Sequence, residues 1–217
     1  MSVTHVLFDL DGVLLDTEGL YTQAAQVIVS RFGKTYGWAI KRHTMGRDAR
    51  VSTRYLLDAL EIPLTTEEFL DEYRTVLEPL LARSPVMPGA EAFVRKLSLA
   101  GVPMAVATSS ERRLFDIKSA PHDWFALFDA VVCGDDPRVA AKKPSPDIFL
   151  VAASELGAAP SACVVFEDSP AGIAAALSAG MRVVAIPHPE LGPEPCAGAH
   201  RIVSGWEAVV SHEIDTW

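Results

Sequence analysis

The chain has 217 residues and carries 19 basic against 28 acidic side chains, a formal net charge of −9. This length allows one well-buried α/β domain with an inserted subdomain. The acidic balance, with no dense stripe of Lys and Arg, argues against nucleic acid or an anionic membrane surface as the main partner. The three cysteines, Cys133, Cys163 and Cys196, are odd in number and far apart, which argues against a disulfide framework or a zinc site.

No apolar run approaches the ~18 residues of a membrane span. Together with the cysteine usage, this leads us to expect a soluble cytoplasmic protein that does not bind membranes. We also expect it to be monomeric.

Short apolar runs alternate with stretches of helical character along most of the chain. Such alternation predicts a doubly wound parallel sheet, a Rossmann-like α/β core. The predicted strands are His5–Phe8, Val102–Ala107, Ala130–Cys133, Ala162–Phe166 and Arg182–Ile186, with a weak last strand at Arg201–Val203.

The segment between the first two strands follows a different pattern. Leu20, Ala24 and Val27 repeat at helical spacing, and Phe69, Leu70 and Tyr73 do likewise further on. We therefore predict an inserted helical cap over residues 17–83 and an α/β core formed by residues 1–16 and 84–217.

Polar residues occur in four groups at or near the predicted strand ends. Side chains that follow parallel strands converge on one crevice outside the carboxyl edge of the sheet. The groups are Asp9 with Asp11, Thr108 with Ser109 and Ser110, Lys143, and Glu167 with Asp168.

Four carboxylates in one pocket would repel one another unless a divalent cation and a lysine share the site. A hard cation such as Mg²⁺ suits carboxylate oxygens, and its charge implies an anionic substrate. One carboxylate could then attack phosphorus, and a second acid two residues later could protonate the leaving alcohol and afterwards deprotonate water.

With these residues the chain resembles the haloacid dehalogenase superfamily of phosphohydrolases that carry a helical cap after the first strand. The resemblance covers nearly the whole chain, and the four motifs occur in the family's order. Five segments further resemble the pseudouridine-5′-phosphatase branch: Asp9–Glu18, Ala107–Ser110, Leu114–Lys118, Gly134–Pro137 and Phe166–Pro170.

The resemblance implies a role for each site residue. Asp9 corresponds to the nucleophile and Asp11 to the general acid/base. Phosphate binding is implied for Thr108 and Lys143. From the residues themselves, Ser109 offers a further hydroxyl and backbone N–H at the start of a helix, which suits a phosphate oxygen. In the cap, Gly46 could allow a turn that brings Arg47 to the substrate, with a solvated helix charge as the alternative for Arg47. The implied Mg²⁺ ligands are Asp9, Asp11 through its backbone carbonyl, Asp168, and Glu167 beside it. Lys142 stands where the family usually has glycine, which leaves two adjacent lysines to choose between.

These roles predict a Mg²⁺-dependent phosphatase of a small phosphomonoester, and the resemblance to the branch implies pseudouridine 5′-phosphate as the leading substrate. Alternatives within the family are a phosphatase of sugar or glycerol phosphates and a sugar phosphomutase, which uses the same core residues. A phospho-accepting signalling domain also gathers acids, a hydroxyl and a lysine on such a sheet. It needs only ~120 residues and no helical insertion after its first strand, so the length and the insertion disfavour it.

Overall fold

The computed structural model describes residues 3–41, 43–44, 49–190 and 192–209. The chain forms two compact units. One comprises Met1–Asp16 and Pro85–Trp217, which we call the core unit, and the other comprises Thr17–Ser84, which we call the helical unit.

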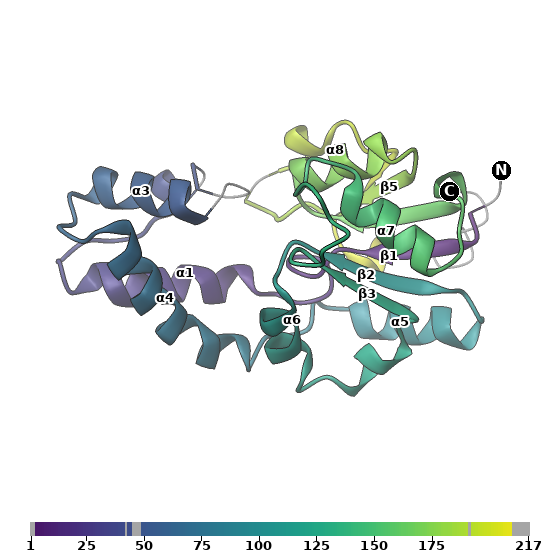
Figure 1. Ribbon diagram of the computed structural model, residues 1–217, viewed down its shortest axis with the longest axis horizontal. Coiled ribbons are helices and arrows are strands. Elements are labelled where there is room, and N and C mark those ends of the chain that lie inside the picture. Colours follow the sequence, from purple (N-terminus) through teal and green to yellow (C-terminus); the bar gives the residue numbers. More distant parts are fainter. Residues whose placement is uncertain (1–2, 42, 45–48, 191, 210–217) are drawn as a thin grey trace. The chain divides into compact units, whose positions relative to one another are not determined.

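The core unit contains a six-stranded sheet in the order β3-β2-β1-β4-β5-β6 (Figure 1). Every neighbouring pair of strands is parallel, so the predicted doubly wound α/β fold is confirmed. The strands are β1 (His5–Phe8), β2 (Met104–Thr108), β3 (Ala130–Cys133), β4 (Cys163–Glu167), β5 (Arg182–Ala185) and β6 (Arg201–Ile202).

Both faces of this sheet are covered, because its central strands are apolar on both sides. Phe8 packs with Phe166 and Trp206 in one buried cluster, whereas Leu7, its neighbour in the strand, packs with Phe149 in another. The first cluster includes residues of α5 (Ala90–Leu99) and α6 (Arg112–Ser119), and the second includes residues of α7 (Asp147–Glu155) and α8 (Pro170–Ser178). Short 3₁₀ turns lie at Asp123–Leu127, Pro160–Ala162, Glu194–Cys196 and Trp206–Ala208.

The helical unit is built from α1 (Glu18–Ser30), α2 (Trp38–Lys41), α3 (Ala49–Leu60) and α4 (Thr66–Leu81). It has its own apolar cluster, in which Ile28 of α1, Leu56 of α3 and Phe69 of α4 are buried. A capping box closes the start of α4: Thr65 accepts from the backbone N–H of Glu68, whose side chain accepts from the N–H of Thr65. The unit is therefore stabilised from within, and its action as a cap stays a prediction.

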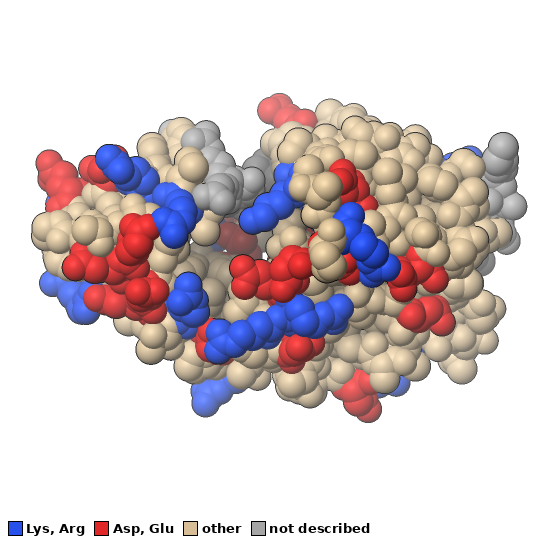
Figure 2. Space-filling view, in the orientation of Figure 1, with Lys and Arg blue, Asp and Glu red and all other residues tan. Residues whose placement is uncertain are grey.

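Surface charges of both signs lie side by side in each unit on the face shown in Figure 2. Ion pairs between exposed residues include Arg31 with Glu72 in the helical unit and Arg95 with Glu91 in the core unit. Within the described ranges, no helix combines the length and the hydropathy that crossing a membrane requires.

The polar groups predicted from the sequence follow three neighbouring strands. β1 pairs with β2 on one side and with β4 on the other, so the chain leaves the sheet at adjacent points after Phe8, Thr108 and Glu167. The strand order also reverses between β1 and β4, which is where ligands bind in sheets of this type. The centre of this edge is therefore the place to look for a site.

Candidate active site

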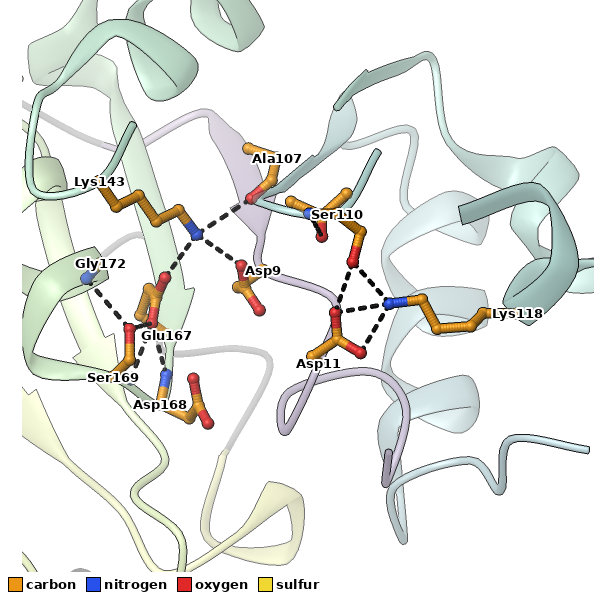
Figure 3. A network of polar contacts seen from close by, with 11 residues as sticks. Asp9, Asp11, Ala107, Ser110, Lys118, Lys143, Glu167, Asp168, Ser169 and Gly172 are labelled. Atoms are coloured by element: carbon orange, nitrogen blue, oxygen red, sulfur yellow. Dashed lines mark hydrogen bonds and ion pairs between the residues drawn. The ribbon is translucent and has the colours of Figure 1, made fainter. Parts of the chain in front are cut away.

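Asp9, the first residue after β1, forms a buried ion pair with Lys143. The Lys143 Nζ donates to Asp9 Oδ1 at 2.5 Å and to Glu167 Oε1 at 2.6 Å. It also donates to the backbone oxygen of Ala107 at 3.3 Å, which ties it to the end of β2 (Figure 3). One lysine thus connects β1, β2 and β4 at the edge where all three end.

The described contacts distinguish the two adjacent lysines. The Lys143 side chain is 6% exposed, whereas Lys142 is exposed to solvent. Lys143 is therefore the lysine that the fold directs into the site.

Glu167, the last residue of β4, is engaged through both of its carboxylate oxygens. Oε1 accepts from Lys143, and Oε2 accepts from the backbone N–H groups of Asp168 and Ser169 at 2.9 and 2.8 Å. The Ser169 hydroxyl also donates to Oε2 at 3.0 Å. Both oxygens therefore contact Lys143 or the start of α8, and a role of Glu167 as a metal ligand stays a prediction.

Gly172 in α8 makes room for the Glu167 carboxylate. A Cβ placed on Gly172 would lie 1.7 Å from Glu167 Oε1, far inside van der Waals contact. The glycine is therefore needed for close approach, since it brings the first turn of α8 against this acid.

Burial shifts the pKa values of Asp9 and Lys143. Burial, together with the neighbouring carboxylates of Glu167 and Asp11, raises the pKa of Asp9 to about 7, although Lys143 opposes the shift. Burial pulls the pKa of Lys143 down, but Asp9 and Glu167 outweigh it, and the pKa lies above its ordinary value. Lys143 is therefore the fixed positive charge against which Asp9 is held.

Asp11 lies in a separate polar group formed by Ser110 and Lys118 (Figure 3). Lys118 Nζ donates to Oδ1 and to Oδ2 of Asp11, each at 2.7 Å. It also donates to the Ser110 Oγ at 2.7 Å, and Ser110 donates to Asp11 Oδ2 at 3.0 Å. Two carboxylates only two residues apart are thus held by two different lysines.

Asp168 has a carboxylate that no described side chain or backbone group pairs with, although it is half-buried beside Glu167. Burial and the carboxylates of Glu167 and Asp9 hold its pKa well above the ordinary value. Its carboxylate lies against Gly12, where an added Cβ would stand 2.3 Å from Asp168 Oδ2. Gly12 has φ +81°, so it serves both the turn and this close approach.

The hydroxyl residues after β2 differ in their surroundings. Thr108 is buried, and its Oγ1 accepts from the backbone N–H of Ser110 at 3.1 Å. Ser109 is exposed, and its backbone oxygen lies where a Cβ on Gly134 would be 2.4 Å away. Both therefore stand at the site edge, and their phosphate contacts stay predictions. Gly46 and Arg47, predicted to contact the substrate, lie outside the described residues.

Lys118 is the site residue to which the sequence assigned no role, although it ends a segment typical of the family branch. The signal is a lysine at a core-facing position. Phe115 and Lys118, three residues apart on one face, are the two buried residues described in α6. A lysine in a core-facing position must be paired to stay charged there. Such a position could have indicated a partner.

Comparisons with known proteins agree with this geometry. Residues 3–180 match the model of a hydrolase family described as haloacid dehalogenase-like hydrolase. A probable pseudouridine-5′-phosphatase of Drosophila melanogaster is 44% identical over 93% of this chain and 89% of the relative. The (DL)-glycerol-3-phosphatase 2 of Arabidopsis thaliana is 41% identical over 88% of this chain and 82% of the relative. The crystal structure of CbbY from Rhodobacter sphaeroides in complex with phosphate has a TM-score of 0.81 and 26% identity, covering 99% of this chain and 100% of that one.

The family match spans most of the chain, and the chain therefore belongs to the haloacid dehalogenase-like hydrolases. The resemblance drawn from the motifs is confirmed. The expectation of an enzyme of the phosphoric monoester hydrolase class is confirmed as well.

Proposed function

We propose that this enzyme hydrolyses a small phosphomonoester through an aspartyl-phosphate on Asp9, with Asp11 as general acid and then general base. The observation that carries the proposal is the separation of the two carboxylates. Asp9 is held by Lys143 and its side chain is 10% exposed, whereas Asp11 is held by Lys118 and its side chain is 28% exposed. Two acids in different environments can take two different roles in one reaction.

We propose Mg²⁺ as the cofactor, held by the carboxylates of Asp9 and Asp168 and by the backbone carbonyl of Asp11. No group of three or more acidic, histidine or cysteine side chains with metal-binding geometry occurs in the described part of the chain. Mg²⁺, however, is commonly bound by only one or two carboxylates with waters and substrate phosphate. The unpaired Asp168 carboxylate, in the space that Gly12 leaves open, fits that donor set. Bound there, Mg²⁺ would neutralise and orient the transferring phosphoryl group.

In the first step, an oxygen of the Asp9 carboxylate attacks phosphorus and the bond to the leaving oxygen breaks. Asp11, in its protonated form, gives its proton to that oxygen, and the alcohol leaves. Lys143 keeps Asp9 oriented and supplies positive charge next to the incoming phosphoryl oxygens. Thr108, buried at the end of β2, is the hydroxyl proposed to bind one of these oxygens.

In the second step, Asp11 takes a proton from a water molecule that attacks the phosphorus of the aspartyl-phosphate. The bond to Asp9 breaks, inorganic phosphate leaves, and Asp11 holds the proton for the next cycle. The same residue thus serves as acid and as base. This requires its carboxylate to stay correctly placed through both steps.

For the substrate we propose pseudouridine 5′-phosphate first, because the Drosophila relative bears that activity in its name. The Arabidopsis relative named as a glycerol-3-phosphatase is nearly as similar, which makes glycerol 3-phosphate the second candidate. The helical unit is proposed to act as the cap that selects the leaving alcohol.

A substrate panel with and without Mg²⁺ tests this function. Phosphate release from pseudouridine 5′-phosphate, glycerol 3-phosphate and several sugar phosphates is compared as kcat/KM. We expect one of the small phosphomonoesters to be clearly preferred and release to stop in a chelator. Full rates in chelator would refute the metal proposal. Conversion of one sugar phosphate into its isomer without phosphate release would indicate a phosphomutase instead.

A further inference from the structure

The Lys118 side chain is fully buried in the core unit, although it ends in an ammonium group. Removing an ammonium group from water is unfavourable unless its N–H groups are paired. Here they are directed to Asp11 Oδ1, Asp11 Oδ2 and Ser110 Oγ, each 2.7 Å away. The lysine is therefore built into the fold as a partner for the Asp11 carboxylate.

We propose that Lys118 is a positioning residue that holds the Asp11 carboxylate in place for both proton transfers, with the Ser110 hydroxyl bonded to both of them. The proposal rests on the proposed function, in which Asp11 is the acid and base. Two bonds from one ammonium fix both oxygens of the carboxylate, and the Ser110 hydroxyl adds a third at 3.0 Å. Rotation of the carboxylate would break at least one of these bonds.

The side chains of Asp11 and Lys118 differ in their exposure to solvent, and this difference separates their proposed roles. The Asp11 side chain is 28% exposed, whereas Lys118 lies entirely beneath it. Asp11 can therefore meet a substrate oxygen or a water molecule, and Lys118 meets neither. Lys118 contacts Asp11 and Ser110, whereas Lys143 is a direct neighbour of the proposed nucleophile Asp9.

The first test is Lys118→Met in steady-state kinetics with the best substrate of the panel. We expect kcat to fall by roughly 10- to 100-fold, the range that a slightly misplaced acid/base costs. KM should change by less than about twofold, because Lys118 does not touch the substrate. Ser110→Ala should give a smaller loss of the same kind, and Lys96→Met, which removes an exposed lysine of α5, serves as the control.

A double-mutant cycle with Asp11→Asn separates positioning from a general structural role. If Lys118 acts through Asp11, Lys118→Met should cost little further kcat once Asp11 has been replaced. Independent, multiplying losses would overturn the proposal, and so would a raised KM with unchanged kcat. Thermal unfolding of each variant checks the fold. Should Lys118→Met not fold, the cycle is run with Ser110→Ala and the same criteria apply.

A second readout uses p-nitrophenyl phosphate, whose leaving group departs without a proton from an acid. Lys118→Met should then release nitrophenol in a burst close to one equivalent per enzyme, followed by slow turnover, because only the second step still needs Asp11. Equal slowing of burst and turnover would contradict the positioning role. Asp9→Asn separates the two hypotheses: activity in that variant refutes the proposed function itself, whereas a failed cycle with inactive Asp9→Asn refutes only the role of Lys118.

Discussion

Asp9 and Asp11 stand two residues apart in the chain, yet they occupy two different polar regions. The Asp9 side chain is 10% exposed and shares Lys143 with the buried Glu167. The Asp11 side chain is 28% exposed, and its lysine comes from α6. The comparison teaches that two identical residues so close in the chain can be held in different environments, which is the basis of the two different roles proposed for them.

The two lysines differ in the same sense. Lys143 lies between two carboxylates, so its removal would leave both without a cation. Lys118 serves one carboxylate that also has a hydroxyl partner and partial access to water. We call Asp9, Lys143 and Glu167 the Asp9 side of the site. Substitutions on the Asp9 side should therefore have the larger effects, both on activity and on the free energy of unfolding.

The largest effect is expected from Asp9→Asn, which removes the nucleophile but keeps the size of the side chain. We expect turnover to fall by roughly 10³-fold or more, because neither step of the reaction can then occur. Asp11→Asn should be impaired but measurable, since Asp9 can still attack. Phosphate release assays compare the turnover of the two variants. Turnover near the wild-type level in Asp9→Asn would refute the proposed mechanism.

Lys143→Met should strongly reduce the free energy of unfolding. Breaking a buried ion pair leaves an uncompensated charge and typically costs about 3–5 kcal/mol. We expect a smaller loss for Lys118→Met, because Asp11 keeps Ser110 and its exposure to water. Urea unfolding of both variants measures the difference. Lys142→Met, which replaces the exposed neighbour, is the matched control and should change the free energy of unfolding by less than about 0.5 kcal/mol.

Asp9, Asp11 and the residues after β2 and β4 could be predicted from the sequence, whereas Lys118, the partner of Asp11, could not. β1, β2 and β4 are short apolar runs, and parallel strands place whatever follows them at one edge, so Asp9, Thr108 and Asp168 could be grouped from pattern alone. Lys118 lies within a helix, and its contact with Asp11 depends on how α6 turns against the sheet. Strand order carries no information about that rotation.

The contacts of Glu167 could not be predicted either. An acid beside Asp168 has the composition of a metal ligand, a role that stays a prediction, and only the structure shows that its two oxygens also hold Lys143 and the start of α8. That arrangement depends on Gly172, three residues beyond Ser169, whose lack of a side chain could not be connected with Glu167 from spacing alone.

Gly172→Ala tests how tightly the Asp9 side is packed. The new Cβ would lie 1.7 Å from Glu167 Oε1, so the carboxylate or α8 must move. Forced overpacking of this kind typically costs about 1–3 kcal/mol, and the displaced Glu167 should also disturb Lys143. Thermal unfolding and kcat are measured together. Gly19→Ala in α1 offers a control at a helical glycine that has no atom within 4 Å of the added Cβ and no positive φ. Equal effects of the two substitutions would contradict the packing argument.

The smallest effect concerns the pH dependence of Mg²⁺ binding. Without metal, burial raises the pKa of Asp9 from 3.8 to about 7, so the carboxyl is increasingly protonated as the pH falls below 7. Because Mg²⁺ needs ionised carboxylates and the pKa of Asp168 is raised as well, protons compete with the metal, and the apparent affinity should weaken by about tenfold or more for each pH unit below that value. Calorimetric titration of the metal-free enzyme with Mg²⁺, at pH values from about one and a half units below the raised pKa of Asp9 to about one unit above it, measures this. An affinity that stays flat throughout would mean that Asp9 titrates like an exposed carboxyl, and the two sides of the site would then not differ in the way their burial implies.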